Sequence, residues 1–359
     1  MRNIKHIGKT LGFRMGAAAQ SAVMATMAVC AVALTAAPAS AQAPKIMLRA
    51  ADSLPTNHVF SVGFQAWMKR VTELTNGQVT FQHYPNEQLG KRKDMFDIAR
   101  NGTADIAYVL PVDQPGQLAR TTVMELPGIS ALSSCGTPVL WKMMQANANE
   151  EYLPNGIRPL FALYVGGYEI FSNKDIRTPA DLKGMKIRSA GGVQDVTVKA
   201  LGAVPIPIAS PEVYEAVQRK TLDGVLFPWV GIKPYKMQEV TKNGTFGAAL
   251  GATALTYVMN ERAYQKLPPN VQAAMAKATE EIMPKTTAEQ DKTLTDAVAE
   301  FKKGGMKVAD LTAAERAEWI KALGDVEKNW MDSATKNGVK NPKAVLDARK
   351  AFAVSVGCA

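Results

Sequence analysis

Short apolar segments alternate with segments of helical periodicity from residue 46 onward. Ile46–Ala51 is a short apolar run typical of a strand, and Phe60–Leu74 places its apolar side chains at helical spacing. Gln78–Tyr84 alternates apolar and polar residues as a second strand does, a helical pattern surrounds Met95, and Ala104–Leu110 is a buried-strand pattern. Because strands and helices alternate at this spacing, the sequence predicts an α/β fold with a mostly parallel sheet.

The same alternation recurs after residue 160. Phe161–Val165, Lys186–Arg188 and Leu222–Phe227 are extended patterns, and helical patterns cover Gln194–Leu201 and Pro211–Gln218. A second β/α unit, in a chain longer than one compact core usually supports, indicates two domains. Loops at the carboxyl ends of strands line the ligand clefts of such folds.

We therefore predict a two-lobed α/β fold with a ligand cleft between the lobes. Lobe I is predicted to comprise residues 42–165, with about 252–285 returning to it. Lobe II is predicted to comprise 166–251, with about 286–359 packing on it.

A helical pattern dominates the last hundred residues. It runs from Glu261 to about Lys303 and is expected to be interrupted at Pro268-Pro269 and at Pro284, because proline lacks the amide hydrogen of a helix interior. The tail from Ala309 has the apolar spacing of an amphipathic helix.

Residues 1–41 have the parts of an export signal. Four basic residues precede the apolar run Met15–Thr35, which leads to the small residues Ala39-Ser40-Ala41. We predict cleavage after Ala41 and a periplasmic protein. A retained membrane anchor is the alternative, since the run approaches the roughly 18 residues that span a bilayer. A lipid anchor at Cys30 is disfavoured because no small residue precedes it.

Charge and composition argue against nucleic acid as a partner. Cleavage removes four of the 42 Lys and Arg and none of the 32 acids, so the net charge falls from +10 to +6. The basic residues are scattered among acids, which is typical of a solvated surface, and no basic stripe is interleaved with aromatic residues.

Two cysteines, Cys135 and Cys358, remain after cleavage. In an oxidising compartment they form either a disulfide or two free thiols.

The sequence contains no recognisable catalytic motif. After cleavage the only histidines are His58 and His83, and the sequence contains no zinc-protease, nucleophile-elbow, phosphate-loop or dinucleotide-binding motif. Metal-ligand clusters are absent from the sequence as well. We therefore predict a protein that is not an enzyme and that uses no cofactor or metal.

Several segments together resemble one family, the DctP-type substrate-binding proteins of tripartite ATP-independent periplasmic (TRAP) transporters. The resemblance covers about Ile46 to the region of Trp330 and depends on the order and spacing of the matching segments. These segments are the His58 loop, Val71–Gly77, Tyr84–Gly90, Gly102–Ile106, Thr178–Arg188, Val213–Val217, Asp223-Gly224, and Asn260 with Leu267-Pro268.

The resemblance implies a function in transport. Members of this family close two lobes on a small organic acid, have a long helix that spans both lobes, here near 261–303, and deliver the acid to two integral membrane subunits driven by an ion gradient. The alternative partner is a sensor kinase that reads the bound ligand.

Arg188 is the strongest candidate for ligand binding. It ends the Lys186–Arg188 strand pattern, so its side chain should emerge at the carboxyl end of the strand, and it matches the motif of the family. A guanidinium there can hold a carboxylate through two parallel charge-assisted hydrogen bonds. The alternative is an arginine paired with a surface acid such as Asp195.

Two departures from the family pattern suggest the kind of acid. Glu169 stands where many relatives have a second arginine, and Phe227 stands where an asparagine usually contacts the ligand. Losing a cation and an amide makes a second carboxylate harder to satisfy. The sequence predicts a monocarboxylate with an apolar or aromatic body, unless Lys91, Arg92 or Lys93 reaches the cleft.

The remaining candidate ligand contacts are His58, Tyr168, Trp229 and Tyr257. Each has a structural alternative, which is a locally bonded loop histidine for His58 and core packing for the aromatic residues, Phe227 included. Glu169 would pair either with a lysine or with an amino group of the ligand.

Overall fold

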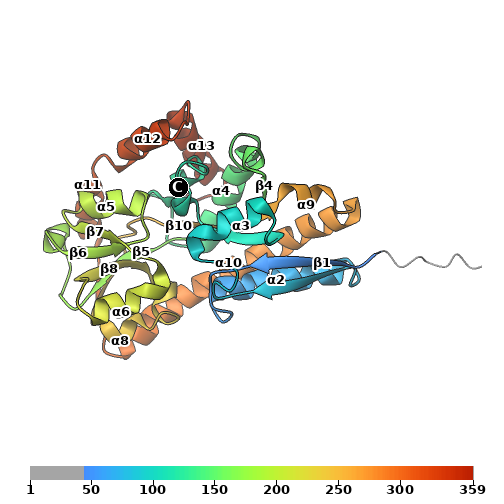
Figure 1. Cartoon of the computed structure of the whole chain (residues 1–359). Helices are drawn as coiled ribbons and strands as arrows, with labels where there is room; N and C mark the ends of the chain where they lie inside the picture. The colour runs from blue at the N-terminus through green and yellow to red at the C-terminus, as the bar shows by residue number, and fades with distance from the viewer. Residues whose placement is uncertain (1–43, 359) are drawn as a thin grey trace, which may run out of the picture. The chain divides into compact units, whose positions relative to one another are not determined.

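Two β-sheets organise residues 44–358, the part of the chain that the computed structural model describes (Figure 1). The predicted signal peptide and its cleavage site lie outside these residues. The first sheet has the order β2-β1-β3-β10-β4, and its strands are β1 (Ile46–Ala51), β2 (Val79–Tyr84), β3 (Ile106–Val109), β4 (Ile157–Val165) and β10 (Thr253–Asn260). The second has the order β11-β9-β5-β8-β6-β7, and its strands are β5 (Tyr168–Ser172), β6 (Lys186–Ser189), β7 (Val204–Pro207), β8 (Gly224–Pro228), β9 (Asn243–Phe246) and β11 (Lys307–Asp310).

Both sheets are mixed, whereas the sequence predicted mostly parallel pairing. In the first sheet β1 is parallel to β2 and β3, but β10 is antiparallel to both β3 and β4. The chain leaves this sheet through β4 and re-enters it through β10, so the two adjacent strands must run in opposite directions. In the second sheet β5, through which the chain enters, is antiparallel to β8 and to β9, after which the chain returns to the first sheet.

Helices cover both sheets. They are α2 (Val59–Leu74), α3 (Met95–Asn101), α4 (Ser133–Ala146), α5 (Val193–Ala200), α6 (Val213–Gln218), α7 (Trp229–Ile232), α8 (Met237–Val240), α9 (Glu261–Gln265), α10 (Pro269–Lys303), α11 (Ala313–Leu323), α12 (Val326–Lys336) and α13 (Pro342–Ser355). Of these, α4, α7 and α8 are those that the sequence did not predict.

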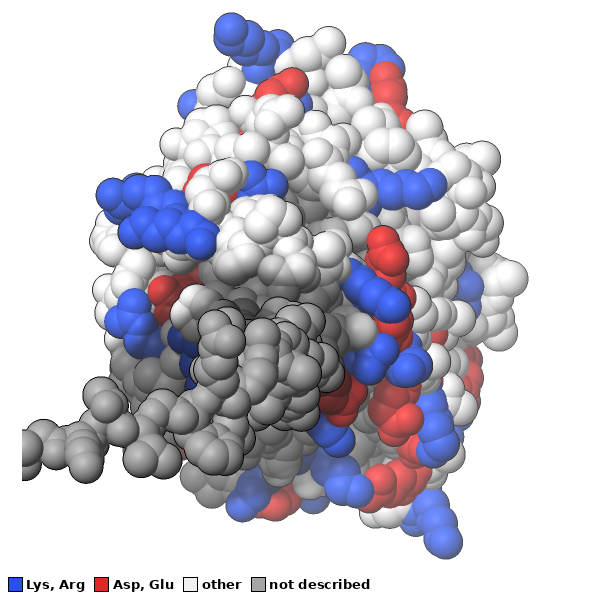
Figure 2. Space-filling view, turned by 90° about the vertical axis from the view of Figure 1, so that its right-hand side faces the viewer, with Lys and Arg blue, Asp and Glu red and all other residues white. Residues whose placement is uncertain are grey.

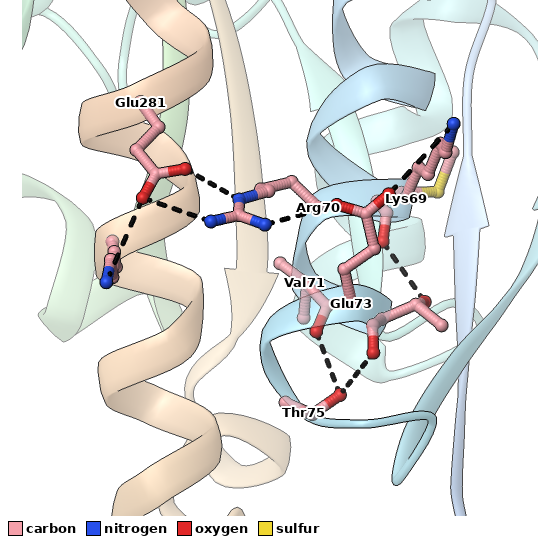
Figure 3. A network of polar contacts seen from close by, with 9 residues as sticks. Lys69, Arg70, Val71, Glu73, Thr75 and Glu281 are labelled. Carbon is pink, nitrogen blue, oxygen red and sulfur yellow. Dashed lines mark hydrogen bonds and ion pairs between the residues drawn. The ribbon is translucent and has the colours of Figure 1, made fainter.

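Helix α2 packs on α10 through an apolar face and a polar rim. The buried Trp67 donates its indole N–H to Thr279 Oγ1 at 2.9 Å. On the rim, Arg70 holds the Glu281 carboxylate with Nε at 2.6 Å and Nη2 at 3.3 Å, and its Nη1 reaches Glu73 (Figure 3). These ion pairs are about one third exposed, so their main effect is to fix the angle between the helices rather than to add much stability.

Helix α10 contacts elements associated with both sheets. It packs on β4 and α2 beside the first sheet and on β11 and α7 beside the second. It passes through Pro284 without a break, contrary to the interruption predicted there. The carbonyl that loses its helical partner belongs to Glu280, an exposed residue, so water can satisfy it. The predicted break at Pro268-Pro269 is present, between α9 and α10.

The C-terminal segment has contacts on both sides. Helix α11 packs on α5, and its Trp319 donates to the Arg177 carbonyl. Helix α13 packs on α4, and a disulfide joins Cys135 in α4 to Cys358 just beyond α13. The contacts of the segment 286–359 are therefore divided between elements of the two predicted lobes, and the lobe boundaries themselves stay a prediction.

The surface is of mixed charge. On the part of the face in Figure 2 that grey atoms do not cover, Lys and Arg are interspersed with Asp and Glu in some places and stand among uncharged residues in others. Within residues 44–358, no helix combines the length and the apolar character that crossing a membrane requires.

Candidate functional site

A cavity lies between the two sheets. Residues near the first sheet, including His58, Tyr108 and Thr253, line it together with Tyr168, Arg188 and Phe227 from the second sheet. Its lining combines aromatic walls with a few polar groups, as small-molecule sites usually do.

Strand β6 places Arg188 in this cavity. The residue is 1% exposed, and three of its N–H groups are held by the protein, by the Ile208 carbonyl at 2.9 Å, the Leu226 carbonyl at 3.2 Å and Ser210 Oγ at 3.3 Å. The pairing with Asp195 considered above does not occur, because that carboxylate accepts a hydrogen bond from Ser189 Oγ instead.

The Arg188 guanidinium is a buried cation without an acidic partner. No carboxylate of residues 44–358 lies within 4.0 Å of it, and two of its five N–H groups have no acceptor there. Burial lowers its pKa to about 10, which leaves the group charged at neutral pH. A buried unpaired charge is costly, so this arrangement favours binding of an anion in the cavity.

The Phe227 ring lies beneath this cation, with the Arg188 Cζ atom 4.9 Å from its centroid. The side chain is 1% exposed and packs edge to face with Tyr235 at 5.6 Å. A phenyl face next to a guanidinium supplies cation–π attraction and an apolar wall. Phe227 therefore lines the cavity and also contributes to the packing around it.

His58 combines the local role and the cavity position that were weighed as alternatives. It is the N-cap of α2, where its Nδ1 accepts a hydrogen bond from the Phe60 amide, and it also lines the cavity. Burial lowers the pKa of the ring to about 4, so His58 is neutral at pH 7. With Nδ1 as acceptor, the neutral ring carries its proton on Nε2.

Tyr168 joins the two sheets at the edge of the cavity. Its hydroxyl lies 2.7 Å from Thr253 Oγ1, so β5 of the second sheet contacts β10 of the first. Burial raises the pKa of this phenol, which is neutral at physiological pH.

Trp229 and Tyr257 do not line the cavity. The Trp229 indole donates to the Thr245 carbonyl and packs edge to face on Phe171, within the core of the second sheet. The Tyr257 ring stacks on Phe64 with centroids 3.8 Å apart, and its hydroxyl donates to Asp52. Both follow the core-packing alternative, Trp229 from the first residue of α7 and Tyr257 from β10.

The Glu169 carboxylate does not line the cavity and is surrounded by hydrogen-bond donors. It accepts hydrogen bonds from the amides of Gly247, Ala248 and Ala249 and from Thr245 Oγ1, at 2.6–3.2 Å. Residues 247–249 lie between β9 and β10, where the chain returns to the first sheet. Glu169 thus fixes this crossing to β5. Within residues 44–358 it pairs with no lysine, and it does not line the cavity.

We expect Glu169→Gln to lower the free energy of unfolding by about 1–3 kcal/mol, because the amide turns an N–H toward backbone donors that then lack an acceptor. Urea unfolding measures the effect. Glu239→Gln, at an exposed position on α8, is the matched control. Equal stability of Glu169→Gln and the unsubstituted protein would contradict this role.

Many cavity residues were not among the candidates drawn from the sequence, and Tyr108, Tyr235 and Ser210 are three with polar side chains. Tyr108 lies in a segment with a buried-strand pattern, and Tyr235 lies in a loop after Pro234. At neither position does the sequence pattern distinguish a ligand contact from core packing. Arg92, which the sequence offered only as an exception, also lines the cavity. Lys91 and Lys93 are exposed and do not.

Comparison with known proteins agrees with this geometry. Residues 50–333 match the family of bacterial extracellular solute-binding proteins, family 7, named DctP. The chain belongs to this family. The DctP resemblance drawn from the sequence is thereby confirmed, and so is a periplasmic location, which is where DctP proteins act.

Individual DctP relatives differ in the ligands named for them. The C4-dicarboxylate-binding periplasmic protein DctP of Rhodobacter capsulatus is 30% identical over 260 residues, which cover 70% of this chain and 76% of that protein. A TRAP solute-binding protein from Rhodoferax ferrireducens, solved with copurified benzoate, has a TM-score of 0.81 at 23% identity and covers 87% of this chain and 99% of its own.

A second solved structure is a marine metagenome TRAP solute-binding protein specific for aromatic acid ligands, in complex with metahydroxyphenylacetate. Its TM-score is 0.80 at 23% identity, with 87% of this chain and 99% of that chain covered. At this identity the two solved structures establish the fold, and the predicted two-lobed α/β class is confirmed.

Proposed function

We propose that this solute-binding protein captures a small monocarboxylate with an aromatic or apolar body and delivers it to the membrane subunits of a TRAP transporter. One observation carries the proposal. Arg188 is a charged, buried guanidinium with two N–H groups unoccupied by residues 44–358, and it faces a cavity with a phenyl ring beneath it.

Aromatic walls support the choice of ligand body. Phe60, Tyr108, Tyr168, Phe227 and Tyr235 all line the cavity. An aromatic pair in offset or edge-to-face geometry contributes roughly 0.5–1.5 kcal/mol beyond the burial of its surface. The benzoate and metahydroxyphenylacetate bound by the two solved relatives have such a body.

The dicarboxylate named for the Rhodobacter capsulatus relative is the competing ligand class. In this chain Glu169 occupies the position where the sequence comparison expected a second arginine, and it provides no charge to the cavity. A second carboxylate would need a cation of its own, because an unpaired buried charge costs several kcal/mol.

A thermal-shift screen tests the ligand class. We expect benzoate, 3-hydroxybenzoate and mandelate to raise the unfolding temperature and succinate, malate and fumarate to leave it unchanged. A ligand at 100 times its dissociation constant stabilises the folded state by about 2.7 kcal/mol. Stabilisation by the dicarboxylates alone would contradict the proposal.

The genes beside this one test the transporter as partner. Genes for TRAP membrane subunits there would support the transporter as partner, and a sensor kinase gene there would oppose it.

A further inference from the structure

A second guanidinium faces the same cavity from the opposite side. Arg92 lies in the 3₁₀ turn Arg92–Asp94, which leads into α3 beside the first sheet, whereas Arg188 belongs to the second. Its side chain is 8% exposed, and its Nη2 donates to Asp113 Oδ1 at 2.8 Å.

The ion pair between Arg92 and Asp113 leaves polar atoms of both side chains without a hydrogen-bond partner. Arg92 Nε is buried without an acceptor, Nη1 makes no hydrogen bond within residues 44–358, and Asp113 Oδ2 is buried without a donor. Buried polar groups are nearly always satisfied, so the free donors of Arg92 indicate that something else completes this site.

Among the residues that line the cavity and their ion-pair partners, the charges sum to one uncompensated positive charge. Within residues 44–358 Arg188 has no acidic partner, Arg92 is offset by Asp113, and Glu87, also in the lining, is paired with Lys91 at 3.0 Å. Two further acids lie nearby without lining the cavity. Burial raises the pKa of Glu125 well above its ordinary value and favours its neutral form. The oxygens of Asp52 are occupied by the Leu54 amide and the Tyr257 hydroxyl, with His83 Nε2 3.7 Å away.

We propose that Arg92 is a second contact for the ligand carboxylate, reaching it from the lobe opposite Arg188, and that Asp113 restricts the cavity to monoanions by neutralising one of the two guanidinium charges. The proposal rests on the proposed function. A single carboxylate between two cations removes their repulsion across the cavity, so the closed form is electrostatically favoured when a monoanion is bound.

Calorimetry with benzoate and isophthalate tests both parts, since isophthalate is benzoate with one more carboxylate. Arg92→Met should weaken benzoate binding about tenfold to a hundredfold, because charge-assisted hydrogen bonds are lost. Arg158→Met is the matched control, since this arginine pairs with Glu261 outside the cavity lining, and it should bind benzoate as the unsubstituted protein does.

Asp113→Asn keeps an acceptor for Arg92 but removes the negative charge. We expect it to raise the affinity for isophthalate relative to benzoate by at least about tenfold. An unchanged ratio would overturn the role of Asp113 in selectivity. Unfolding curves of each variant separate loss of binding from loss of folding.

The outcomes for the two arginines distinguish this inference from the proposed function. If Arg188→Met loses benzoate and Arg92→Met binds it normally, the second contact is wrong and the proposed function stands. If Arg188→Met also binds benzoate normally, the proposed function fails first. Should Arg92→Met unfold, Arg92→Lys replaces it, and normal binding by that variant would contradict a contact that needs the planar guanidinium.

Discussion

Replacing Arg188 by methionine is expected to abolish measurable carboxylate binding. The side chain offers two unoccupied N–H groups to the cavity, and each charge-assisted hydrogen bond contributes roughly 1.5–3 kcal/mol. Losing both corresponds to about two to four orders of magnitude in the dissociation constant. Calorimetry with benzoate measures the loss, and methionine keeps most of the buried volume.

The conservative variant separates charge from geometry. Arg188→Lys retains a cation but cannot donate to Ile208, Leu226 and Ser210 while also presenting a planar pair of donors to the ligand. We expect it to bind benzoate about tenfold to a hundredfold more weakly than the unsubstituted protein. Unchanged affinity of a folded Arg188→Met protein would disprove the assignment of Arg188 as the carboxylate anchor.

Removing the disulfide is expected to produce the largest loss of stability. Cys135 and Cys358 are 223 residues apart in the sequence and fix the C-terminal helix α13 to α4. A cross-link between distant residues reduces the entropy of the unfolded chain, and removal of a native disulfide typically costs about 2–5 kcal/mol. The double variant Cys135→Ser/Cys358→Ser should therefore unfold at lower urea concentration and lower temperature.

Reduction offers an independent test of the same bond. A reductant should shift the unfolding midpoint of the natural protein to that of the double variant and leave the midpoint of the double variant unchanged. Neither cysteine lines the cavity, so we expect the affinity for benzoate to be retained at temperatures where the variant is folded. Coincident unfolding curves before and after reduction would show that the disulfide does not contribute.

The order of strands and helices was predictable because it depends on local patterns. Apolar alternation and helical spacing identified β1, α2 and the strand of Arg188. The strand pattern that ends at this arginine predicted a side chain at the cleft, and Arg188 lines the cavity. Strands β9 and β11 were missed. Each is four residues long, and the two pair with each other across sixty residues of sequence, a contact that no local window contains.

Which side chains face the cavity was decided by contacts between distant segments. Phe227 and Trp229 are two residues apart, but the first lines the cavity and the second packs on Phe171, because β8 ends between them and α7 begins. Glu169 is a charged residue of the kind that often contacts a ligand. Its carboxylate instead accepts hydrogen bonds from the amides of residues 247–249, where the chain returns to the first sheet. Sequence alone contains neither the position of that crossing nor the direction of the side chain.

Local patterns and the family motif thus predicted the fold class, much of the order of elements and the residue that we propose as the principal anion-binding residue, since each of these depends on residues close together in the sequence. Tertiary structure alone decided that Arg92 and Asp113 meet beside the cavity and that Cys135 reaches Cys358. The physical reason is that burial, hydrogen-bond partners and net charge at a site are sums over side chains from many segments, and only the folded chain brings those segments together.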